Sequence, residues 1–129
     1  MSDSTAEGMT VTNLLWQRAD HSPQAIAFVR ELAGGQWEGI SWQTFRDRAD
    51  CLRRALAAAG LRKGDRLALI APVSVEWELV HHAALSMGAV IVGLDTHDLP
   101  ERIGTMVEQA DVAALAVADS SALAGIDPG

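Results

Sequence analysis

A stripe of hydrophobic residues runs along the segment from Trp42 to Ala59, at spacings of three and four. Its members are Phe45, Ala49, Leu52, Leu56 and Ala59. Residues at these spacings share one face of an α-helix, which predicts an amphipathic helix that buries the stripe. Gly60 follows directly and suits the left-handed backbone that often ends a helix.

Two segments before this helix have the composition of β-strands. Ala25–Arg30 and Trp37–Trp42 flank a Gly34-Gly35 pair, which is typical of a turn. The spacing predicts an antiparallel hairpin with a loop of several residues.

Small polar residues mark the predicted helix starts in this half of the chain. Thr12 is predicted to cap a short helix from Asn13 to about Asp20, and Ser41 is predicted to cap the long helix. Pro23 disfavours a helical conformation in the residue before it, so the first helix should end before the hairpin.

Three apolar runs follow the long helix, at Arg66–Ala71, Ala89–Leu94 and Val112–Val117. They lack the alternation of a half-exposed strand, which predicts strands buried on both faces of a parallel sheet. Because helices are predicted between them, the order after the hairpin is α-β-α-β-α-β. Right-handed crossovers of this kind give an α/β fold.

The two helices between these strands have their own start signals. Ser74 is predicted to cap a helix that ends at Gly88 and is apolar nearly all round, so we expect it to be largely buried. Asp98 and Glu101 have the spacing of a capping box for the next helix, and Pro100 fits its first turn.

We therefore predict one α/β domain at residues 10–119, with an amino-terminal β-hairpin and a parallel sheet. Residues 1–9 read as a flexible tail. Residues 120–129 form no obvious element, and we expect them to be a linker or a truncated end.

Composition and charge narrow the class of protein and its partners. The 129 residues are 49% hydrophobic and 21% charged, which is ordinary for a globular domain. Ten basic and seventeen acidic residues give a formal net charge of −7, and an acidic surface repels nucleic-acid phosphates. With no signal-peptide pattern and no apolar run near the ~18 residues of a membrane span, we expect no transmembrane segment and a cytoplasmic location.

The chain contains one cysteine, Cys51, so no internal disulfide can form. Its neighbours in the helical pattern include Ala49, Leu52 and Ala55. This setting predicts a packed, inert thiol rather than a nucleophile.

Motifs for catalysis or phosphate binding are missing from the sequence. The Gly34-Gly35 pair lies between predicted strands and has no Lys-Ser/Thr after it, which excludes a P-loop. No serine has a Gly-x-Ser-x-Gly context. Lys63, the only lysine, lies in a turn before a strand. We therefore assign no catalytic and no cofactor-binding residue to this chain.

One group of histidine and acidic residues approaches a metal-binding pattern. Glu78 and His82 are four residues apart on a predicted helix, and His81 lies beside them. Adjacent helical residues point about 100° apart, and no two-histidine spacing of the zinc type occurs. We therefore expect no metal site, and interpret these residues as polar edges of a buried helix.

The loop residues Asp95, Thr96 and His97 come directly after a predicted parallel strand. In open α/β sheets, ligands bind at the carboxyl ends of the strands. These three residues are therefore candidates for contact with a ligand in a larger protein, and an ordinary surface loop is the alternative.

From Asn13 to Asp119, the order of features resembles the start of the adenylate-forming, or acyl-activating, ligases. That superfamily includes acyl-CoA synthetases, luciferase-like enzymes and the adenylation domains of peptide synthetases. The segments that carry the resemblance are Asn13–Phe28, Ile40–Phe45, Ala59–Ala68, Glu76–Trp77, Ala83–Val90 and Asp98–Ile103. The chain resembles acyl-CoA synthetases, including the fatty-acid type, more than it resembles peptide-synthetase adenylation domains.

Two segments depart from the family pattern. The family often has Asn-Ser-Pro-Glu where this chain has Val73–Glu76, and Pro-Leu followed by an aromatic residue or Asn and Pro where this chain has Gly93–His97. The second departure leaves the class of substrate open.

The resemblance implies a parent enzyme that uses ATP and Mg²⁺ to form an acyl-adenylate from a carboxylic acid. The acyl group then passes to CoA or to a phosphopantetheine carrier. The family's phosphate loop, adenine-binding motif and catalytic lysine come after the region present here. We therefore expect this chain to bind no cofactor by itself, to be inactive alone, and to have the remainder of the ligase domain as its partner.

Two alternatives remain open. The first is a stand-alone binding or interaction module that derives from this family, and the second is an unrelated small α/β ligand-binding domain. The sequence beyond Gly129 would separate these readings, because a phosphate loop within the next several dozen residues favours the ligase fragment.

Overall fold

The computed structural model describes residues 11–118, which form two compact units, one ending at Cys51 and one beginning at Leu52. The expected tail at residues 1–9 and the expected end at 120–129 lie outside the described residues. Helix α3 (Trp42–Ala58) contributes its first half to one unit and its second half to the other.

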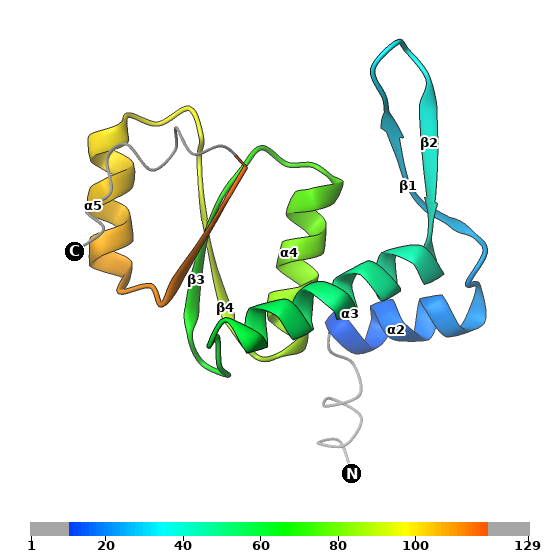
Figure 1. The fold of residues 1–129 in the computed structure, drawn as a ribbon, viewed down its shortest axis with the longest axis horizontal. Coiled ribbons are helices and arrows are strands. Elements are labelled where there is room, and N and C mark those ends of the chain that lie inside the picture. The colour runs from blue at the N-terminus through cyan, green and yellow to red at the C-terminus, as the bar shows by residue number, and fades with distance from the viewer. Residues whose placement is uncertain (1–10, 119–129) are drawn as a thin grey trace. The chain divides into compact units, whose positions relative to one another are not determined.

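The first unit contains helix α2 (Val11–His21) and the antiparallel strands β1 (Ile26–Glu31) and β2 (Trp37–Ser41) (Figure 1). The hairpin prediction is confirmed, and both glycines of its turn have positive φ angles, 89° and 78°. Helix α2 begins at Val11, so Thr12 lies inside its first turn and is not its cap. Val11 and Thr12 are neither proline nor glycine, so the sequence does not force this helix to begin after Thr12.

The core of the first unit forms around Phe45, which is fully buried on α3. Its ring packs against Phe28 of β1, with the ring centroids 4.8 Å apart. Ile40 of β2 and Ala49 of α3 are buried as well. The start of α3 is fixed by Ser41, whose Oγ accepts a 3.1 Å hydrogen bond from the backbone N–H of Thr44, as the sequence predicts.

The second unit is a parallel three-stranded sheet in the order β4-β3-β5, which confirms the predicted α/β fold. Its elements are β3 (Arg66–Ile70), α4 (Val75–Ser86), β4 (Val90–Leu94), α5 (Pro100–Ala110) and β5 (Ala114–Val117). Helices α4 and α5 cover opposite faces of this sheet (Figure 1). The central strand β3 is therefore buried on both sides.

Alternate side chains of β3 enter two different clusters. Leu67 packs with Leu61, Ala84 and Ala89 on the α4 side of the sheet. On the other side, Ala68 and Ile70 pack with the α5 residues Ile103 and Val107. This alternation is the two-residue period of a strand, and it explains why the run contains no polar position.

Strand β4 departs from the prediction of a strand that is buried on both faces. Val90 is 48% exposed, and the remaining β4 positions are half-buried or exposed. The reason is its place at one edge of the described sheet, where no further strand covers it. Helix α4 is also less buried than predicted: its buried residues are Val75, Ala83 and Ala84.

Three further local predictions about helices are wrong. Cys51 is exposed rather than packed, because it is two residues from Ala49 and so about 200° away from the stripe. Ala59 is exposed because α3 ends at Ala58. Asp98 makes no side-chain cap for α5; Leu99 holds the cap position, and Pro100 begins the helix as predicted.

Candidate functional site

The loop that begins at Asp95 follows β4 at the carboxyl end of the parallel sheet, as the sequence predicts. The backbone N–H of His97 donates a 2.9 Å hydrogen bond to Oδ1 of Asp95, and the His97 ring nitrogen Nδ1 lies 3.2 Å from the same oxygen. These two interactions, the backbone one first, lower the pKa of the Asp95 carboxyl group. The carboxylate form is the one that a cationic or hydrogen-bond-donating ligand would meet.

The rest of this loop is held by short-range contacts. Thr96 is half-buried, whereas Asp95 and His97 are exposed. The backbone N–H of Asp98 donates to the carbonyl of Asp95 at 3.2 Å, and the Asp98 carboxylate lies 3.7 Å from Arg102 of α5. The loop is thus attached to the start of α5 by a surface ion pair rather than by a helix cap.

Lys63 lies at the opposite end of the sheet from this loop. It is in the turn between α3 and β3, so it stands at the amino end of the central strand. The backbone N–H of Gly64 in that turn donates a 2.9 Å hydrogen bond to the carbonyl of Gly88. Lys63 is therefore not placed beside Asp95, Thr96 and His97.

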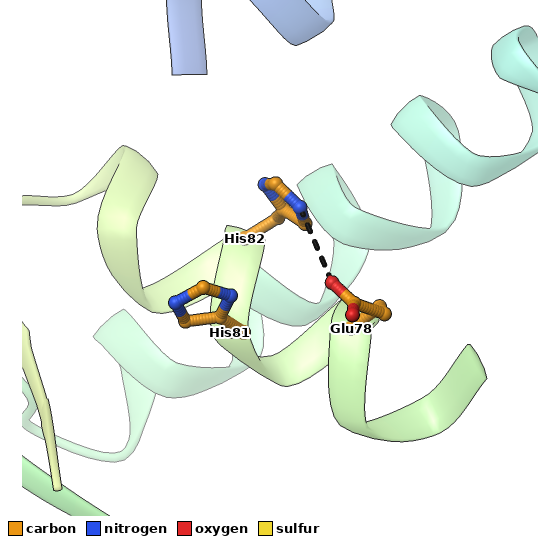
Figure 2. Close-up of side chains that lie close together, drawn as sticks. All are labelled: Glu78, His81 and His82. Carbon is orange, nitrogen blue, oxygen red and sulfur yellow. Dashed lines mark ion pairs between the residues drawn. The ribbon is translucent and has the colours of Figure 1, made fainter. Parts of the chain in front are cut away.

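A second group of polar side chains comes together on α4. Glu78, His81 and His82 each offer a ligand atom, and these atoms all lie within 4.8 Å of one another (Figure 2). The Nε2 atom of His82 is 3.5 Å from Oε2 of Glu78. Burial is the main cause that lowers the pKa of His82; His81 lowers it further, and Glu78 acts in the opposite direction.

Sequence reasoning did not foresee this proximity. The 100° angle between adjacent helical residues describes their Cβ directions, whereas the ring nitrogens stand several bonds further out. The ring of His81 lies 4.9 Å from the ring of Trp77 and 5.4 Å from that of His82, measured between centroids. The spacing of Glu78 and His82, one helical turn apart, was the available signal. These contacts do not test the expectation of no metal site.

The family profile described as AMP-binding enzyme matches residues 15–128. The chain belongs to this family. It is 30% identical over 116 residues to the putative acyl-CoA synthetase YngI of Bacillus subtilis, covering 86% of this chain and 20% of that protein. It is 30% identical over 120 residues to the long-chain-fatty-acid–AMP ligase FadD26 of Mycobacterium tuberculosis, with the same coverage.

Solved structures agree with the family assignment. The O-succinylbenzoate coenzyme A synthetase MenE of Bacillus subtilis, in complex with AMP, superposes with a TM-score of 0.76 at 27% identity. The match covers 84% of this chain and 27% of that one. The chain spans 2% to 34% of the length of the curated relatives that it matches, so it corresponds to only part of each of them.

Among the described residues, no helix has the length and apolar character that crossing a membrane requires.

Proposed function

We propose that this chain is the amino-terminal part of an ATP-dependent ligase that activates a carboxylic acid. The complete enzyme attacks the α-phosphorus of ATP with the carboxylate and forms an acyl-adenylate and pyrophosphate. The thiol of CoA or of a phosphopantetheine carrier then takes the acyl group, and AMP leaves. The observation that carries this proposal is the family match over residues 15–128.

The names of the relatives support a fatty-acyl substrate for the parent enzyme. One relative is named a long-chain-fatty-acid–AMP ligase and another a putative acyl-CoA synthetase. We propose that the loop residues Asp95, Thr96 and His97 border the bound substrate, because they follow β4 at the carboxyl end of the parallel sheet. A cytoplasmic location fits this metabolic role.

We propose further that the chain is inactive alone. Phosphoryl chemistry requires fixed cations or backbone donors around the phosphates, and Mg²⁺ to neutralise the charge of the leaving pyrophosphate. Lys63 lies at the amino end of β3, away from the loop of Asp95. The groups that hold ATP and Mg²⁺ therefore belong to the remainder of the ligase.

The test is carboxylate-dependent release of pyrophosphate from ATP and Mg²⁺. The isolated chain should show no release above a heat-treated control, whereas a longer product of the same gene should release pyrophosphate with a fatty acid. Turnover by the isolated chain, in a preparation free of other ligases, would overturn the inactivity. A longer product with no turnover on any carboxylic acid would count against the ligase assignment.

A stand-alone interaction module is the alternative function. It is favoured by the described sheet, in which β4 and β5 each lack a neighbour on their outer side. An unpaired strand edge can accept a strand from a partner protein. A gene that stops after residue 129 and encodes a compact monomer would support the module.

A further inference from the structure

We propose that Glu78, His81 and His82 of α4 form a binding site for a divalent transition-metal ion, best suited to Zn²⁺. The three residues occupy one turn of a single helix, and Figure 2 shows Glu78 and His82 turned toward each other with His81 beside them. Their ligand atoms lie within 4.8 Å of one another without any element having to move. The site therefore requires only that α4 be folded.

The Glu78–His82 pair has the separation of two ligands of one ion. Its 3.5 Å distance is longer than the roughly 2.9 Å of a usual N–H···O hydrogen bond. Two atoms that each lie about 2.1 Å from a tetrahedral zinc ion stand roughly 3.4 Å apart. An ion between the imidazole nitrogen and the carboxylate oxygen thus fits this pair with little change of position.

His81 provides an independent indication that a ligand is bound at this place. Its Nδ1 atom is buried and has no hydrogen-bond partner among the described residues. Buried polar atoms in folded proteins almost always have a partner. The nearby Trp77 ring limits the orientations of the imidazole. A rotation of His81 about its side-chain bonds would bring a ring nitrogen to the ion and complete a three-ligand site.

The ligand types select the metal. Two imidazoles and one carboxylate suit Zn²⁺, Ni²⁺, Co²⁺ and Cu²⁺, whereas Mg²⁺ prefers ligands that are all oxygen. Partial burial, with 29% and 15% of the Glu78 and His82 side chains exposed, strengthens the attraction between the carboxylate and a cation. Three protein ligands also leave a coordination position for water. This site is thus distinct in chemistry from the Mg²⁺ that accompanies ATP.

The proposal is tested by equilibrium dialysis of Zn²⁺ against the tag-free, metal-stripped 129-residue chain. Circular dichroism first shows that the helices of this chain are formed. We expect one ion per chain, retained in a large excess of Mg²⁺. Co²⁺ should give the visible absorption of a site with nitrogen and oxygen ligands. Glu78→Gln, His81→Ala and His82→Ala should each weaken binding, roughly tenfold or more, since even outer-shell partners of metal ligands contribute this much.

The loop pair Asp95 and His97 is the matched control, because it also places a carboxylate within 3.2 Å of a histidine nitrogen but on the exposed surface. His97→Ala should leave Zn²⁺ affinity unchanged. Where an α4 variant does not fold, proton NMR of the unmodified chain decides: Zn²⁺ should shift the ring signals of His81 and His82 and not that of His97. Equal losses in His97→Ala and His82→Ala, no stoichiometric binding, or unshifted His81 and His82 signals would each overturn the site.

Discussion

Leu69 lies in the central strand β3 and is 1% exposed. Leu69→Ala should lower the free energy of unfolding by about 2–5 kcal/mol, because it removes buried methyl groups and leaves a cavity in the core. Val73→Ala is the matched apolar control, since Val73 is 79% exposed after β3 and should change stability by less than about 0.5 kcal/mol. Denaturant melts measure both, and the opposite ranking would contradict the burial of β3.

His82 should make the stability of the metal-free chain depend on pH. Burial, followed by the charge on His81, lowers its pKa in the folded state below the ordinary value of 6.5. The unfolded chain therefore binds a proton at higher pH than the folded chain does. Stability should be complete above pH 6.5 and should fall as the pH drops from 6.5 toward the folded-state pKa.

His82→Gln, which is neutral at every pH, should reduce this fall when melts are recorded in a chelator between pH 7.5 and about 5. The chelator excludes stabilisation by bound metal, which is lost at low pH for a different reason. A variant with the same pH slope as the parent chain would show that His82 does not contribute to it.

At the scale of single helices, a side-chain cap distinguishes α4 from α5. The Oγ of Ser74 accepts a 3.2 Å hydrogen bond from the backbone N–H of Trp77, whereas Leu99 at the start of α5 has no side-chain oxygen to offer. Ser74→Ala should therefore cost about 1 kcal/mol of stability. Asp98→Ala should cost less than about 0.5 kcal/mol, because it removes only an ion pair with Arg102. Equal losses in thermal melts of the two variants would argue against this distinction.

The type and the order of the helices and strands were predictable, because they follow from local sequence signals. The apolar run of β3, the glycine turn of the hairpin and the polar start of α4 each act over a few residues. Burial depends on which neighbours a segment has in space. For this reason the apolar run at Val90 predicts a strand correctly but not its place at a sheet edge.

The candidate sites also divide into what local sequence signals predict and what depends on contacts in space. The place of Asp95, Thr96 and His97 at the carboxyl end of β4 follows from strand order alone, and it is confirmed. The approach of Glu78, His81 and His82 depends on side-chain rotamers and on the ring of Trp77, which a residue spacing does not specify. Sequence patterns therefore placed the loop correctly, and they named the three α4 residues without predicting that their side chains converge.

At the scale of the whole molecule, the described sheet has fewer strands than the roughly five or six of an average sheet. It has three strands, and both outer strands lack a neighbour on one side among the described residues. Large apolar side chains are also exposed, including Trp37 at 67%. Under the proposed function, later strands and helices of a larger ligase would cover such surfaces. The isolated chain should therefore bind a hydrophobic dye and self-associate.

A charged residue placed on the β4 edge distinguishes self-association through strand pairing from self-association by other surfaces. Val90→Lys places a lysine on the edge strand β4. Natural proteins use charged side chains on edge strands to prevent pairing between sheets. This variant should therefore show less association in light scattering. Val73→Lys adds the same charge outside the sheet and should have a smaller effect. If both variants dissociate the chain equally, exposed apolar side chains in general rather than the β4 edge control association. A parent chain that is a monodisperse monomer without dye signal and with a sharp melt would instead favour the stand-alone module, because such a module must already cover its apolar surface.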